Sequence, residues 1–253
     1  MSERPAYLLE YLLRIADTSL VLAQRLGEWI GHAPAIEEDL GFANTALDLL
    51  GQARLLLAYA AEVEGRGRSA DDLAFLREES AYRNATLAEL PNGDFGDTIV
   101  RQFLIDAYQL ALYERLTDSS DLRLAEIAAK AVNETRYHVR YSSGWVVRLG
   151  DGTDESHDRV QASLERFWPY VQELFEADDI DRAALADGTA PPAQDLCDAW
   201  SRRVDAVLAE ATLLRPAASP FRWYGKHGRH SEHLGHLLAN LQYLQRTHPG
   251  ATW

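Results

Sequence analysis

Apolar residues recur at helical spacing along almost the whole chain, and this pattern constrains the fold more than any other feature. Between residues 6 and 30 they follow one another at steps of three, four and seven. Alternation of apolar and polar residues never persists, and no Asn-Gly pair lies between β-branched runs, so the sequence contains no convincing strand. We therefore predict an all-α fold.

Turn and capping signals divide the pattern into separate helices, because Gly and Pro interrupt helices and Asp caps them. We expect four long helices over residues 6–30, 37–64, 94–117 and 122–149, followed by helices over 154–176, 194–214 and 230–246. A shorter helix capped by Asp71 and Asp72 should reach toward Leu90. Residues 177–192 resemble a loose acidic segment, and residues 215–229 a loop. Four long helices joined by turns indicate an up-and-down bundle with additional C-terminal helices, in one domain spanning residues 1–253.

Composition restricts the setting in which such a bundle works. The 253 residues include one cysteine, Cys197, which rules out an internal disulfide and fits a reducing cytoplasm. We find no run of about 18 apolar residues and no basic-then-apolar leader in residues 1–5, so we expect neither a membrane span nor secretion. The net charge of -14 disfavours nucleic acids and anionic membranes as partners.

Four acidic residues, one in each of the four long helices, have the order and spacing that are typical of the carboxylates in a di-iron bundle. The four are Asp17, Asp48, Asp106 and Glu134. Such a centre takes a Glu from each of two helices and a Glu-x-x-His pair from each of two others. Here three of the four are the shorter Asp. Gly51 follows Asp48 by three residues and Tyr137 follows Glu134 by three, so neither histidine is present.

Three interpretations of these acidic residues stay open. The carboxylates could be partly solvated, or they could belong to a metal-free polar core in which Lys130 or Arg136 supplies positive charge. The third interpretation is a working di-metal site, with His138 offering one nitrogen from the same helix face as Glu134. Chemistry favours the metal-free core, because one imidazole cannot replace two and Asp leaves the pocket too wide.

Two C-terminal features are candidate binding elements. Histidines recur every three residues at His227, His230, His233 and His236, but this spacing fans them over about half of a helix, so only neighbours could share a metal. The stretch 221–230 concentrates positive charge and aromatic rings in an otherwise acidic chain. It is a partner-binding loop, an anion-binding loop or an ordinary loop, and the first two would use Arg222, Lys226, Arg229, His230 and His233.

Long motifs spread over nearly the whole chain resemble the C subunits of bacterial phenylacetyl-CoA epoxidases, which are ring 1,2-epoxidases. One motif follows Asp17 and another contains Asp48. The matching stretches are residues 20–29, 31–34, 46–52, 91–93, 97–99, 136–138, 230–235, 242–246 and 249–253.

The resemblance implies a ferritin-like helical fold and a non-catalytic, structural role in aerobic phenylacetate catabolism. In that family the A subunit holds the di-iron centre and binds phenylacetyl-CoA. The C subunit pairs with the A subunit, while a B subunit and a reductase complete the electron-transfer system. No catalytic residue and no cofactor carry over to this chain, because the positions that match the metal site are those that deviate. Self-association, and an independent di-metal oxygenase or oxidase, remain the alternatives.

Overall fold

The structure, a computed structural model, describes residues 6–251. Residues 1–5, where no leader was expected, and residues 252–253, including Trp253 of the last motif, lie outside the described residues. Over residues 6–251 the secondary structure is helical, apart from an isolated bridge between Tyr224 and Arg229. The predicted all-α class is therefore confirmed. No helix in this range is long and apolar enough to span a lipid bilayer.

The chain forms two compact units. The first contains Met1–Pro91 together with Trp223–Trp253, and the second contains Asn92–Arg222. The prediction of one domain over residues 1–253 stays a prediction.

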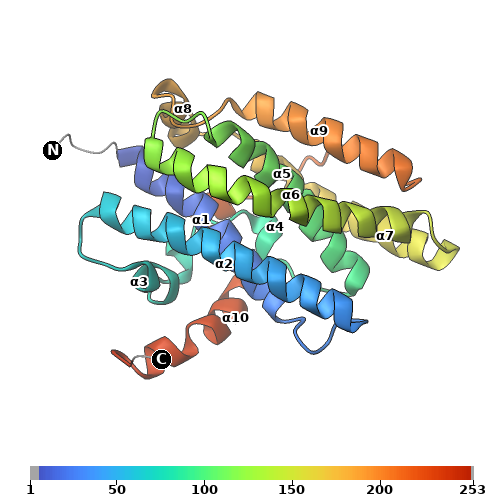
Figure 1. Cartoon of the computed structure of the whole chain (residues 1–253), viewed down its shortest axis with the longest axis horizontal. Coiled ribbons are helices and arrows are strands. Elements are labelled where there is room, and N and C mark those ends of the chain that lie inside the picture. Colours follow the sequence, from blue (N-terminus) through green and yellow to red (C-terminus); the bar gives the residue numbers. More distant parts are fainter. Residues whose placement is uncertain (1–5, 252–253) are drawn as a thin grey trace. The chain divides into compact units, whose positions relative to one another are not determined.

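The first unit is built on two long helices that pack side by side (Figure 1). They are α1 (Ala6–Gly27) and α2 (Ile36–Glu64), and α2 ends where Gly65 adopts a left-handed φ of 68°. Nearly every side chain between Tyr11 and Leu26 is buried, so α1 forms the centre of this unit. Its smaller elements are α3 (Ala70–Phe75), η1 (Glu79–Ala81), α4 (Thr86–Glu89), η3 (Gly225–His227), α10 (Glu232–Leu241) and α11 (Tyr243–Thr247).

The second unit is built on α5 (Phe95–Leu116) and α6 (Leu122–Gly150), which also pack side by side (Figure 1). Asp94 caps α5 and forms a capping box with Asp97, as expected for one of these two residues. Asp121 caps α6. Further helices pack around this pair: α7 (Asp154–Val171), η2 (Gln172–Leu174), α8 (Asp179–Ala186) and α9 (Ala193–Glu210).

Several expected boundaries were wrong. The helix from Asp71 toward Leu90 breaks into α3, η1 and α4, and Ser69 rather than an aspartate caps α3. The segment 177–192 contains α8, which the capping box of Asp178 and Asp181 starts. The last helix begins at Glu232 and is interrupted at Gln242. Helix α9 ends at Glu210, just before Thr212 adopts a left-handed φ of 58°.

Candidate functional site

Asp17 is fully buried in the first unit, and an arginine contacts both of its carboxylate oxygens. The guanidinium of Arg77 forms a two-pronged ion pair with Asp17, in which Nη1 donates to Oδ2 at 2.9 Å and Nη2 donates to Oδ1. The backbone N–H of Arg83 donates to the same Oδ2 at 2.8 Å. Burial alone would lower the pKa of Arg77, but the charge and hydrogen bonds of Asp17 raise it above its ordinary value. Asp17 is therefore neutralised from within the chain.

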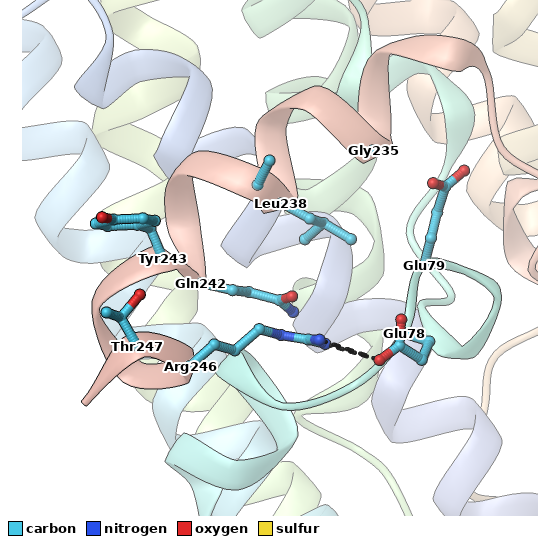
Figure 2. A pocket seen from close by; sticks show the side chains of 9 residues that line it. Glu78, Glu79, Gly235, Leu238, Gln242, Tyr243, Arg246 and Thr247 are labelled. Atoms are coloured by element: carbon cyan, nitrogen blue, oxygen red, sulfur yellow. Dashed lines mark hydrogen bonds and ion pairs between the residues drawn. The ribbon is translucent and has the colours of Figure 1, made fainter. Parts of the chain in front are cut away.

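Arg77 also connects Asp17 to the C-terminal helices. Its guanidinium lies 4.3 Å from the centre of the Tyr82 ring, and burial raises the pKa of that phenol to about 12. The side chain of Gln242 donates 2.9 Å hydrogen bonds to the Arg77 carbonyl and to the Tyr82 hydroxyl. Arg246 donates to the same carbonyl at 3.0 Å and pairs with Glu78 at 3.1 Å (Figure 2). These bonds attach α10 and α11 to the segment of Arg77 and Tyr82, and the Arg77 side chain pairs with Asp17.

A second buried ion pair lies in the same unit, between Glu89 and His230. Nδ1 of His230 bonds Glu89 Oε2 at 2.8 Å, and Nε2 lies 3.1 Å from the carbonyl oxygen of Tyr82. With an acceptor at each nitrogen, the imidazole suits the doubly protonated form. Burial alone would lower the pKa of His230, but Glu89 raises it above its ordinary value. Asn84 and the backbone N–H of Ser231 also donate to the Glu89 carboxylate.

The other acidic position of the first unit differs from Asp17. Asp48 is half-buried on α2. A side chain added at Gly51 would have open space around its Cβ atom among the described residues, so crowding does not explain the glycine.

Asp106 is the buried carboxylate of the second unit. Gln102 donates to its Oδ1 at 2.7 Å and Ser142 donates to its Oδ2 at 2.8 Å. Burial raises the pKa of Asp106 to about 6, against the lowering effects of the His138 charge and of these two hydrogen bonds. His138 is itself buried. Gln102 was expected on the same helix face as Asp106, whereas Ser142 was missed although it follows His138 by one helical turn.

The remaining predicted residues of the second unit lie nearer to solvent. Glu134 is half-buried, and Tyr137 is 40% exposed and stacks on Tyr141. Lys130 and Arg136 are exposed. Arg136 pairs with Glu114 at 3.4 Å. At Asp17 the compensating cation is Arg77, and the role expected of Lys130 or Arg136 at the other carboxylates stays a prediction.

Neither unit by itself presents described residues that fit a carboxylate-bridged metal pair. Within either unit, no three described His, Cys, Asp or Glu side chains form a group that could hold a metal ion. At Asp17, a metal would have to displace a cation that already contacts both oxygens. Asp106 accepts two hydrogen bonds that place an amide and a hydroxyl where ligand bonds would form.

The residues of the candidate C-terminal loop are divided between the two units. Arg222 belongs to the second unit, where it bonds Gln172 and Glu176 at 2.6 Å each. In the first unit, Lys226 is half-buried and Arg229 lies over the Tyr224 ring.

The four histidines of this region do not share a helix either. His227 lies in η3, and His230 precedes α10 and is used internally by Glu89. Only His233 and His236 are on α10.

A different surface of the first unit is more unusual. Helix α2 exposes four large apolar side chains along one face, at spacings of four, seven and three residues. These residues, which we call the α2 stripe, are Ile36 (71% exposed), Leu40 (58%), Leu47 (65%) and Leu50 (42%). Exposed apolar surface marks interaction sites in many soluble proteins.

Comparison with known proteins shows the family of the chain. A family model described as "Phenylacetic acid catabolic protein" matches residues 1–253. The chain is similar to the C subunit of the 1,2-phenylacetyl-CoA epoxidase of Escherichia coli (strain K12), with 52% identity over 243 residues that cover 96% of this chain and 98% of that protein. The ferritin-like helical class that the motifs implied is confirmed. The chain therefore belongs to the phenylacetic acid catabolic protein family and acts in phenylacetate catabolism.

Proposed function

We propose that this chain is a structural, non-catalytic subunit of a multicomponent phenylacetyl-CoA 1,2-epoxidase. In this proposal it pairs with a homologous catalytic subunit, which holds the di-iron centre, and a B subunit and a reductase complete the complex. The similar Escherichia coli protein is named as the C subunit of such an epoxidase, which supports the assignment. Self-association of the chain is not part of the proposal.

The observation that carries the proposal is the ion pair between Asp17 and Arg77. A buried guanidinium that bonds both carboxylate oxygens supplies the positive charge that a metal ion would otherwise supply. Arg suits this role because its planar fork matches a carboxylate and it stays charged in proteins. The position thus stabilises the bundle rather than binding a metal.

The α2 stripe supports the second half of the proposal, which is pairing. Ile36 and Leu50 are 14 residues apart, so the stripe runs for roughly 21 Å at the helical rise of about 1.5 Å per residue. A homologous bundle has an equivalent helix that could pack along such a face. Burial of the stripe against the catalytic subunit would remove apolar surface from water and favour assembly.

The competing function is an independent di-metal oxygenase, and one observation favours it. Asp106 and His138 are both buried and interact electrostatically, so the second unit retains one carboxylate and one imidazole in its interior. This pair alone lacks the four carboxylates and two histidines of a di-iron centre.

Iron assays of the separated chains distinguish the two functions. The purified chain, incubated with Fe(II) and desalted, should hold far less than the two irons of a di-iron centre, while the co-expressed homologous subunit should carry them. Glu134→Gln in this chain should leave turnover of the reconstituted complex unchanged. Stoichiometric iron with an oxygen-sensitive absorption band in this chain alone, or loss of turnover in Glu134→Gln with assembly intact, would favour the oxygenase.

A further inference from the structure

The second unit contains a cavity of about 340 Å³ that is separate from the acidic positions discussed above. It lies where α7, η2 and α9 meet the segment after α9. Its walls include Trp168, Phe175, Trp200, Cys197 and Arg215. Drug-sized ligand pockets begin at about 300 Å³, so this cavity has room for a small molecule with a single ring.

Aromatic rings form one continuous wall of the cavity. The rings of Trp168 and Trp200 have centroids 5.6 Å apart, and Phe175 meets Trp200 edge to face at 5.3 Å. Trp168 and Trp200 are both buried, and the Trp200 indole N–H donates to the Leu104 carbonyl at 2.9 Å, which fixes that ring in place. A rigid wall of this kind favours flat arenes, because aromatic rings attract one another in offset and edge-to-face geometries.

Arg215 adds hydrogen-bond donors to this aromatic wall. Its guanidinium lies 5.2 Å from the Trp168 ring centroid and 5.9 Å from that of Trp200. Asp205 accepts from Nη1 at 2.6 Å, and a guanidinium has five N–H donors in all. The one carboxylate that lines the cavity, Glu176, is paired with Arg222 at 2.6 Å. Arg215 can therefore donate to a further acceptor without a competing free carboxylate at the wall.

We propose that this cavity is a binding site for a small aromatic monocarboxylate. The arene would lie against Trp168, Trp200 and Phe175, and the carboxylate would accept hydrogen bonds from Arg215. Charged acceptors form the stronger hydrogen bonds with guanidinium groups, which favours an acid over a neutral analogue. The site is independent of the proposed structural role, because all its lining residues lie within Asn92–Arg222 and none belongs to the α2 stripe.

Cys197 provides a direct test, because it is the chain's single cysteine and it lines the cavity. We would measure the rate at which a chromogenic thiol reagent modifies Cys197 in the full-length chain, at constant pH, with phenylacetate or its neutral amide, phenylacetamide. Phenylacetate should slow modification in a saturable way at millimolar concentration and change the tryptophan fluorescence over the same range. Phenylacetamide should protect at least about tenfold more weakly, since it lacks the charged acceptor.

Two variants make the test specific. Ala218→Trp, at an exposed position on the cavity wall, should fill the space and abolish protection by phenylacetate, whereas Ala218→Ser should keep it. Arg215→Gln should reduce the preference for phenylacetate over phenylacetamide to near equality. Equal modification rates with and without phenylacetate, or protection that survives in Ala218→Trp, would overturn the site. An unchanged preference in Arg215→Gln would overturn the carboxylate assignment.

Discussion

The buried carboxylate of Asp17 shows that the role of such a residue depends on which group compensates its charge. An ionised carboxylate in a protein interior is costly unless a cation or hydrogen bonds compensate it. In a di-iron bundle the metal compensates the charge, whereas here the guanidinium of Arg77 and the backbone N–H of Arg83 do so. The ion pair also links α1 to the C-terminal helices, because the carbonyl oxygen of Arg77 accepts hydrogen bonds from Gln242 and Arg246.

Arg77→Met should therefore destabilise the chain strongly. The substitution keeps an elongated side chain but leaves the Asp17 carboxylate buried, with the Arg83 N–H as its remaining hydrogen-bond donor among the described residues. Breaking a buried ion pair on one side costs about 3–5 kcal/mol in the free energy of unfolding. Urea denaturation, followed by circular dichroism, measures this loss.

Two further variants show whether the loss comes from the unpaired charge. Arg182→Met removes an exposed pair with Asp179 and should change the free energy of unfolding by less than about 1 kcal/mol. The double variant Asp17→Leu/Arg77→Met should recover most of the stability, because no charge then stays buried. A double variant as unstable as Arg77→Met would show that packing, rather than charge, causes the loss.

At the scale of helices, local signals located most of the elements. Asp94 and Asp121 each precede an apolar run and do cap α5 and α6, and Gly65 ends α2. Residues three or four positions apart share a helix face, and this spacing also predicted that Gln102 lies beside Asp106. Such predictions succeed because their causes lie within one helical turn.

The partners of Asp17 and Glu89 could not be predicted in this way. Arg77 is 60 positions from Asp17, and His230 is 141 positions from Glu89. Nothing in the local sequence distinguishes Arg77 from a solvated arginine, since it follows a leucine and precedes two glutamates. The partner depends on tertiary packing, which periodicity does not contain. The break of the last helix at Gln242 has the same origin, because the Gln242 side chain bonds Arg77 and Tyr82.

The α2 stripe leads to a prediction about assembly. Leu40→Glu/Leu47→Glu should leave the free energy of unfolding of the isolated chain within about 0.5 kcal/mol per site, because both side chains are exposed. The same variant should weaken binding to the homologous catalytic subunit by at least about tenfold, since buried apolar anchors dominate interface energies. Calorimetric titration of the two purified chains measures this affinity.

A matched control exists in the second unit. Leu122 on α6 is 77% exposed, and Leu122→Glu introduces one carboxylate at a residue outside the stripe, against two in the double variant. It should leave the affinity unchanged. Equal affinities for the wild type and Leu40→Glu/Leu47→Glu would remove α2 from the interface.

At the scale of the whole chain, the first unit joins two segments that are far apart in sequence. Trp223–Trp253 folds with Met1–Pro91, and His230, Ser231 and Gln242 provide its buried hydrogen bonds. Two of the C-terminal motifs that resemble the family, residues 230–235 and 242–246, thus contain the residues that make these contacts. The ion pair of Glu89 and His230 makes this closure depend on pH.

The sign of this dependence follows from the raised pKa of His230. A histidine whose pKa is higher in the folded than in the unfolded chain contributes stability that is complete below the unfolded pKa of about 6.5. The contribution is lost as pH rises through the folded pKa, because the folded state then releases its extra proton. Hydrogen exchange, corrected for intrinsic rates, should therefore show residues 77–91 losing protection as pH rises above about 6.5, while residues 92–222 change less.

His230→Ala should lower protection of residues 77–91 at pH 6 and remove its pH dependence, whereas His236→Ala, at an exposed position on α10, should do neither. An equal loss in both units, or the same pH dependence in His230→Ala, would show that closure does not rest on this ion pair.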